Sequence, residues 1–117
     1  MIGGGLPGLV AYSVIAGGTT ASLHEIWRAT GAGIALGDIP GSPVVQSFPD
    51  WNDAVVWIVD DTIPALRGFK AGNGAQVFSS ASRSTDALPG IPHFPPITCA
   101  TTGVFVGTAT GFSYYGP

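Results

Sequence analysis

Glycine and proline interrupt this chain so often that no long regular element fits between them. The 117 residues include 18 glycines and 10 prolines, whereas average usage is roughly 12% for the two together. The residues between these breaks favour strands, because 29 are Val, Ile or Thr and only 14 are Leu, Met, Glu, Lys, Gln or Arg. β-Branched side chains lose rotamer freedom in a helix and pack well on a pleated sheet. We therefore expect an all-β fold, a single small sandwich or barrel of short strands.

The expected strands lie between recognisable turns. Residues 54–59 are apolar at every position, which is typical of a strand buried on both faces. Residues 65–71 and 75–80 flank Gly72-Asn73-Gly74, and these turn residues indicate a hairpin because they accept positive φ angles. Further strands are expected at residues 9–16, 44–48, 97–103, 104–110 and 112–115. The small, polar residues 79–84 are interpreted as an exposed loop.

Residues 22–30 fit two kinds of local structure. Polar and apolar side chains alternate through part of the segment, as in a strand. Ser22 and Glu25 also have the spacing of a helical capping box. We favour the strand, because a glycine-containing turn at 30–33 followed by apolar residues 34–36 would complete a hairpin.

Two segments outside these strands are suited to reaching a neighbour. Residues 1–8 are rich in glycine and are interpreted as an extended arm, with 9–117 as a single β domain. The arm contains the string G-x-G-x-x-G, but Pro7 and Gly8 open no helix, so a dinucleotide site is not expected. Residues 88–96 contain four prolines, which indicates a stiff, extended segment without a strand ladder.

The charge content excludes several classes of partner. Only 9% of the residues are charged and the formal net charge is −3. Four basic residues cannot form the positive stripe that binds phosphates, so nucleic acid is not an expected partner. The longest apolar stretches fall well short of the roughly 18 residues of a transmembrane helix, so we expect no membrane partner.

Few residues of the chain can carry acid–base chemistry or ligate a metal. His24 and His93 are the only histidines and Cys99 is the only cysteine. The zinc-protease spacing H-E-x-x-H fails because residue 28 is arginine. A closed zinc site would need both histidines, Cys99 and an acid. We expect a buried strand cysteine at Cys99, no cofactor, no metal and no enzymatic activity.

Four aspartates flank the apolar segment 54–59, at positions 50, 53, 60 and 61. Paired carboxylates serve calcium binding and glycoside hydrolysis. The chain has no D-x-D-x-D-G loop, and Glu25 is its single glutamate. We therefore interpret the aspartates as turn formers and caps, with a calcium site as the alternative.

The surplus of apolar residues indicates an interface. Mean hydropathy is +0.39, and a small domain buries only about two-thirds of the surface of its unfolded chain. Much of the apolar content must then lie outside, where large patches mark binding surfaces. The arm, the proline-rich segment and aromatic residues in turns or near the C-terminus are the best placed. The candidate interface residues are Ile2, Leu6, Trp51, Pro92, Phe94, Tyr114 and Tyr115.

Taken together, the composition resembles that of structural subunits of bacteriophage particles, which are small, rich in Gly and Pro and poor in charge and cysteine. This resemblance of type implies a non-enzymatic structural and assembly subunit. Within it we expect a capsid decoration (cement) protein that stabilises the shell by binding between coat subunits. Its partners would be coat or other virion proteins, and a homo-oligomer, with a trimer favoured, would bury the apolar surface.

The expected location is the virion. No basic region precedes the apolar residues 6–15, so we expect synthesis in the host cytoplasm without a signal peptide. Two alternatives remain for the function. One is a carbohydrate-binding β module in which Trp51, Tyr114 and Tyr115 stack against sugar rings, and the other is a phage tail or fibre component.

Overall fold

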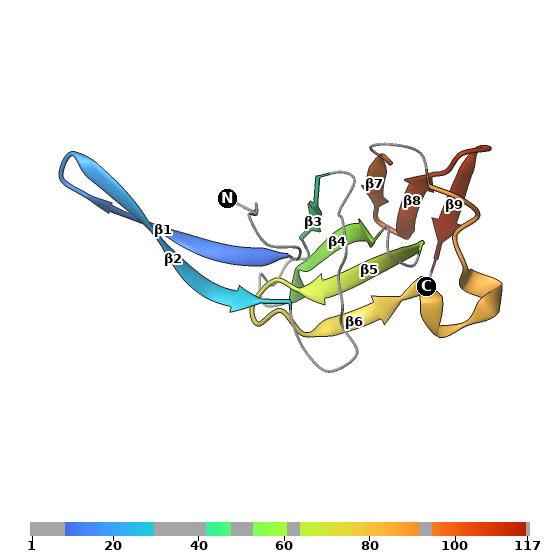
Figure 1. The fold of residues 1–117 in the computed structure, drawn as a ribbon, viewed down its shortest axis with the longest axis horizontal. Helices are drawn as coiled ribbons and strands as arrows, with labels where there is room; N and C mark the ends of the chain where they lie inside the picture. Colours follow the sequence, from blue (N-terminus) through green and yellow to red (C-terminus); the bar gives the residue numbers. More distant parts are fainter. Residues whose placement is uncertain (1–8, 30–41, 48–52, 61–63, 92–94, 117) are drawn as a thin grey trace.

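The computed structural model of the chain describes residues 9–29, 42–47, 53–60, 64–91 and 95–116. Its strands confirm the prediction of an all-β fold. They form three antiparallel sheets, ordered β1-β2, β3-β4-β5-β6 and β7-β8-β9, and over the described residues these do not close into a barrel (Figure 1). The bounds are β1 (Val10–Gly17), β2 (Thr20–Arg28), β3 (Val44–Gln46), β4 (Val55–Asp60), β5 (Ala65–Lys70), β6 (Gln76–Ser79), β7 (Ile97–Ala100), β8 (Gly103–Gly107) and β9 (Phe112–Tyr115). Two short 3-10 turns, η2 (Ser80–Ser82) and η3 (Ser84–Asp86), follow β6.

The four-stranded sheet lies at the centre and is covered on both faces. Its strand β5 is buried at five consecutive positions, Ala65 to Phe69. Successive side chains of a strand point to opposite faces, so this run requires packing on both sides of the sheet. The prediction that residues 54–59 form a strand buried on both faces is confirmed by β4, where Val55 and Trp57 are half-buried and the other four residues are buried.

One face of the central sheet packs against the base of the β1-β2 hairpin. Val56, Ile58 and Phe69 on this face contact Leu9, Trp27 and Ala29 in a single buried cluster. All six side chains are at most 9% exposed. Burial of large apolar side chains in this way contributes about 1.5–3 kcal/mol each, so the base of the hairpin is part of the folded core.

The other face of the central sheet packs against β7-β8-β9. Val59 and Leu66 of the central sheet lie in a cluster with Val104 and Val106 of β8. Half-buried aromatic rings extend this cluster, with Phe78 edge-on to Trp57 and to Tyr115 at 5.7 Å between ring centroids in both pairs. Edge-to-face rings at this separation attract each other beyond the area they bury.

Gln46 joins the central sheet to β7 through both ends of its side-chain amide. Its Nε2 donates to the carbonyl oxygen of Ala100 at 2.9 Å, and its Oε1 accepts a hydrogen bond from Nε1 of Trp57 at 3.0 Å. Both polar atoms of a half-buried amide are therefore paired, which fixes the edge of β3 beside β7.

Several local predictions are confirmed. The hairpin across residues 72–74 joins β5 to β6, with Gly74 at φ 75°. The last predicted strand, residues 112–115, coincides with β9. In the proline-rich segment, residues 88–91, 95 and 96 join no strand, as expected. The predicted exposed loop at 79–84 is wrong at Ser80, which is fully buried because its Oγ accepts a hydrogen bond from the Leu66 amide at 2.9 Å.

The ambiguous segment 22–30 forms a strand over the residues of β2 that it contains, and the helical alternative is wrong. β2 pairs with β1 across a turn in which Gly18 has φ 62°. This positive φ is open to glycine without steric cost, so two adjacent strands pair directly. Residues 34–36, the predicted partner, lie outside the described residues, as does the predicted arm 1–8.

Candidate interaction surfaces

The β1-β2 hairpin projects from the rest of the molecule (Figure 1). The chain measures 50 × 32 × 26 Å along its principal axes, and the hairpin extends along the longest of them. Its register is regular from the pair Tyr12–Glu25 to the pair Gly17–Thr20, and it shifts between Ala11 and Tyr12. We call residues 14–23, the outer part of this hairpin, the blade. The hairpin residues in the buried clusters, Leu9 and Trp27 among them, lie outside it.

The base of the hairpin is held by polar contacts as well as by apolar packing. Nε1 of Trp27 donates to the carbonyl oxygen of Ala71 at 2.8 Å, which ties β2 to the turn after β5. The Ala29 amide donates to the Leu9 carbonyl at 2.9 Å, which closes the hairpin below its last strand pair. The Trp27 ring lies so close to Gly74 that a Cβ there would be 2.5 Å from its Cε3. The blade thus projects from a base that is held in place by contacts with the central sheet.

The blade exposes apolar side chains on both of its faces. Val14 and Leu23 are direct cross-strand partners and are 64% and 46% exposed. Ile15 points to the opposite face and is 53% exposed. The segment 10–23 carries no Asp, Glu, Lys, Arg or His. The charged pair near the blade is Glu25 with Arg28, at 2.7 Å, beside the base.

A two-stranded ribbon of this kind is not expected to be stable in water by itself. An isolated two-stranded hairpin is marginally stable at best, and an exposed strand edge offers unpaired N–H and C=O groups to another chain. Natural proteins protect such edges with charged residues or proline, and neither occurs from residue 10 to residue 23. The blade therefore has the chemistry of a binding element.

A second exposed apolar surface lies on the outer face of β8 and β9. Phe105, Phe112 and Tyr114 are 36%, 70% and 47% exposed. Ring centroids are 4.7 Å apart for Phe105 with Tyr114 and 5.8 Å apart for Phe105 with Phe112. The Tyr114 hydroxyl donates to the Thr102 carbonyl at 3.0 Å, and its ring lies over Gly103, where a Cβ would collide with it. We call these three rings the aromatic face.

The structure separates two residues that the sequence placed in one candidate interface. Tyr114 belongs to the aromatic face, whereas Tyr115 points to the other side of β9 and packs in the core beside Phe78. The Tyr115 hydroxyl donates to the Asp86 carbonyl at 2.8 Å. Burial raises the pKa of Tyr115, with a hydrogen bond to Ser80 opposing the rise and the Asp86 carboxylate adding to it. Tyr115 is therefore a half-buried residue packed against the second core cluster, on the opposite face of β9 from Tyr114.

The other candidate interface residues lie outside the described residues: Ile2, Leu6, Trp51, Pro92 and Phe94. Sequence analysis did not single out the exposed apolar residues of the blade or the two phenylalanines of the aromatic face. The signal was present at the blade, because Gly17-Gly18 stands between two strand-forming segments and no charged residue occurs from Val10 to Leu23. The predicted strand 9–16 therefore ends just before the tip of a hairpin, and the sequence alone did not pair it with residues 20–28.

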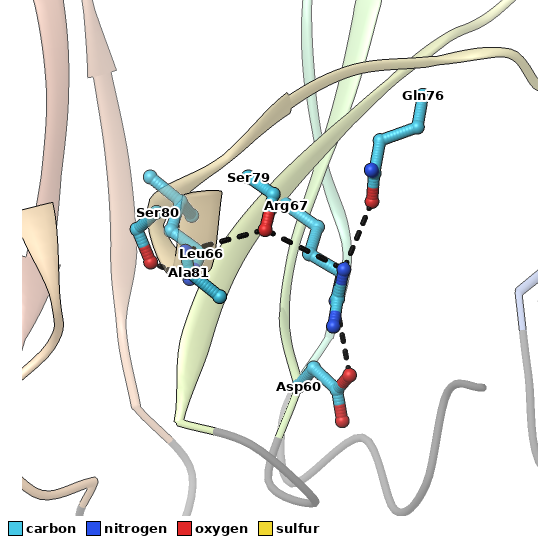
Figure 2. A network of polar contacts seen from close by, with 7 residues as sticks. All are labelled: Asp60, Leu66, Arg67, Gln76, Ser79, Ser80 and Ala81. Atoms are coloured by element: carbon cyan, nitrogen blue, oxygen red, sulfur yellow. Dashed lines mark hydrogen bonds and ion pairs between the residues drawn. The ribbon is translucent and has the colours of Figure 1, made fainter. Parts of the chain in front are cut away.

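Asp60 is the ionisable residue at which the structure differs most from the prediction. It was expected to be a turn former, but it ends β4 inside the protein, fully buried, where its Oδ2 accepts from Nε of Arg67 at 3.0 Å. Figure 2 shows that Nη1 of Arg67 also reaches Gln76 Oε1 at 3.0 Å and Ser79 Oγ at 3.5 Å. The guanidinium on β5 is thus paired with side chains of β4 and β6, so this network is structural.

The remaining candidate catalytic and metal-binding groups are not gathered. His24 and Asp53 are exposed on separate elements, and His93 lies outside the described residues. Cys99 is half-buried beside the second core cluster, and burial raises the pKa of its thiol. In the portion of the chain that the structure describes, no three His, Cys, Asp or Glu side chains are grouped in a way that could hold a metal ion.

Within the same portion, no helix is long and apolar enough to cross a membrane. The surfaces that stand out are thus the blade and the aromatic face. Comparison with known proteins adds no relative, since no family model, no curated protein and no solved structure matches the chain.

Proposed function

We propose that this protein is a non-enzymatic structural subunit that joins neighbouring proteins of a larger particle by adhesion. The observation that carries the proposal is the blade, an uncharged ribbon with apolar side chains on both faces that projects from a well-packed body. Its exposed strand edges and apolar side chains are groups that another protein can cover.

Within that class, the composition favours a bacteriophage particle and a position as a capsid decoration protein that binds between coat subunits. On this proposal the location is the virion, and the partners are coat or other virion proteins together with further copies of this chain. A tail or fibre component is the neighbouring possibility, because the same adhesive surfaces serve any of these positions.

For the body that carries the blade, we propose a small sandwich. The sheets β3-β4-β5-β6 and β7-β8-β9 bury a shared cluster that includes Leu66 and Val106, both fully buried. Two sheets whose inner faces interdigitate in this way form the core of a sandwich. The aromatic face is then the outer surface of the β7-β8-β9 layer, and the blade projects beyond both layers.

The test is to purify the particles made by the virus or host that carries the gene and to measure the copy number of this chain by quantitative mass spectrometry. We expect a fixed number of copies per particle, and none when the genomic copy lacks residues 14–23. Absence of the wild-type chain from every particle fraction, while it is present in the cell, would refute the proposal.

A second candidate function follows from the aromatic face. Tyr114 and the neighbouring Phe112 are exposed and uncharged, and flat rings of this kind can stack against sugars as well as against proteins. Tyr115 is unsuited to this role because it faces the core. Binding on a glycan array that is lost in Phe112→Thr but kept in Val14→Thr would favour the sugar-binding function over adhesion.

A further inference from the structure

The exposed apolar side chains of the described residues gather mainly at the two ends of the molecule. Val14, Ile15, Leu23 and Ile26 belong to the hairpin, and the three rings of the aromatic face belong to β8 and β9. Figure 1 shows the blade and the β7-β8-β9 sheet at opposite ends of the longest axis. Outside these two surfaces, Val45 and Val77 are the large apolar residues that stand exposed.

We propose that the blade of one copy docks on the aromatic face of the next copy, in a head-to-tail contact. This inference rests on the proposed function and names its immediate partner as a second copy of this chain. A symmetric contact between two blades would leave both aromatic faces in water, and a contact between two aromatic faces would leave both blades in water. The heterologous contact covers both surfaces with one interface.

The two surfaces match in charge. Residues 97–116 contain no Asp, Glu, Lys, Arg or His, and neither does the blade up to Leu23. A charged partner would find no complementary charge on either surface and would have to be desolvated against apolar side chains, which is costly. Two uncharged apolar surfaces can instead pack on each other. Val14 and Leu23 of one copy are available to contact Phe105 and Phe112 of the next.

The two surfaces also match in shape. The blade has four paired residues in each strand, so it is about 14 Å long and about 10 Å wide, and a ribbon of this kind packs about 10 Å from a facing sheet. The aromatic face belongs to a sheet of three strands in which β8 has five residues. The ribbon therefore covers the width of β8 and β9 with its own two strands.

The geometry of the contact predicts a closed ring. A single ribbon-on-sheet contact is small beside the total area of roughly 1,600 Å² that a stable pair of proteins buries. In a ring each copy makes two such contacts, one through its blade and one through its aromatic face. Such contacts close when the rotation between copies divides a full turn, so the smallest closed assembly is a reciprocal pair and the next is a trimer.

The test uses the full chain and two double variants, with native mass measured by light scattering across a dilution series. Val14→Thr with Leu23→Thr alters the blade, and Phe105→Thr with Phe112→Thr alters the aromatic face, both with a residue that suits strands. We expect the wild type to form rings that dissociate to monomers. Each double variant raises the midpoint concentration of assembly by more than about tenfold, equivalent to 1.4 kcal/mol. Val77→Thr, on the exposed edge of β6, is the matched control and leaves the midpoint unchanged.

Mixing the two double variants decides between the possible contacts, because each retains the surface that the other has lost. In the ¹⁵N spectrum of the blade variant, unlabelled face variant should shift amide signals of β8 and β9, and unlabelled blade variant should shift none. No shifts from the face variant at millimolar concentration, or a face variant that assembles like the wild type, would overturn the head-to-tail contact. A wild type that is monomeric yet present in purified particles would overturn this inference alone and leave the adhesive function standing.

Discussion

At the scale of single residues, the buried polar side chains of the described residues all have hydrogen-bond partners. Within the described residues, no buried side-chain nitrogen or oxygen lacks a hydrogen-bond partner. Arg67 illustrates the principle, since its side chain is 7% exposed and contacts Asp60, Gln76 and Ser79. Charged groups are excluded from apolar interiors unless they are paired. The network therefore fixes β4, β5 and β6 in register.

Removing one partner of this ion pair should be costly. In Asp60→Ala the guanidinium stays buried but loses its carboxylate, so we expect the free energy of unfolding to fall by about 3 kcal/mol or more. Urea titration followed by tryptophan fluorescence measures the change. The double variant Asp60→Leu with Arg67→Met removes both charges and should be more stable than Asp60→Ala alone. A double variant that is less stable than the single one would contradict this account.

Two glycines of the same turn provide a matched test of backbone requirements. Gly74 has φ 75° and lies under the Trp27 ring, whereas a Cβ at Gly72 would meet nothing within 4 Å. A left-handed conformation costs a residue with a Cβ roughly 1–2 kcal/mol, and at residue 74 the collision with Trp27 adds to it. We expect Gly74→Ala to lose at least about 2 kcal/mol of stability, while Gly72→Ala stays within about 0.5 kcal/mol. Equal losses in thermal unfolding would refute the role of Gly74.

Tyr115 links stability to alkaline pH. Burial raises its pKa above the ordinary tyrosine value, so the folded protein keeps this proton at pH values where the unfolded chain has lost it. Stability from this group is complete below the ordinary value of about 10 and is lost as pH rises through the raised pKa. We expect the free energy of unfolding to fall more steeply above pH 10 in the wild type than in Tyr115→Phe. Parallel pH profiles of the two proteins in urea titrations would show that Tyr115 contributes nothing.

At the scale of elements, prediction succeeded where one strand carries its own signal. The apolar residues of β4 predicted a strand covered on both faces, and the Gly-Asn-Gly turn predicted the hairpin of β5 with β6. It failed where the outcome depends on a distant partner. The sequence around Asp60 is that of a turn, but the residue is buried in an ion pair with Arg67. The sequence around Ser80 is that of an exposed loop, but its hydroxyl is buried and accepts a hydrogen bond from the Leu66 amide.

The candidate surfaces were predicted less well, for a related physical reason. Exposure of an apolar side chain depends on what covers it, and the pattern within β1 and β2 is that of any half-buried strand. Only the register, with Val14 opposite Leu23 beyond the last core contact, shows that the blade leaves the body. For β9, strict alternation assigns Tyr114 and Tyr115 to opposite faces, but the sequence does not say which face is the core.

The blade should be the least stable element of the monomer. It has no residue in the buried clusters of the described chain, and regions with few buried contacts open without global unfolding. We expect amides of β1 and β2 beyond Tyr12 to exchange rapidly in dilute protein and to become protected at concentrations that favour assembly. Hydrogen exchange by mass spectrometry at two concentrations measures this. Protection that is independent of concentration would show that the blade is stable without a partner.

At the scale of the whole molecule, folding and assembly rest on different parts of the chain. The buried clusters use Leu9, Ala11, Trp27 and Ala29 from the hairpin and its flanking residues, and none of these lies between Ser13 and His24. Replacing residues 14–23 with Asn-Gly should re-close the hairpin, because Ser13 and His24 are already cross-strand partners and Asn-Gly suits a two-residue turn. The shortened chain keeps every core contact and loses only the blade.

The last prediction compares this shortened hairpin with deletion of residues 1–8, the arm proposed from sequence. If the blade is the adhesive element, the shortened hairpin unfolds within a few degrees of the wild-type midpoint, about 4 °C per kcal/mol for a domain of this size, but stays monomeric at all concentrations. Deletion of 1–8 also leaves the fold intact and weakens assembly only in proportion to the contacts that the arm makes. Assembly that survives loss of the blade and disappears with the arm would transfer the adhesive role to residues 1–8. Unfolding of the shortened hairpin would instead place the blade in the core, because a core element cannot be removed without the loss of cooperative stability.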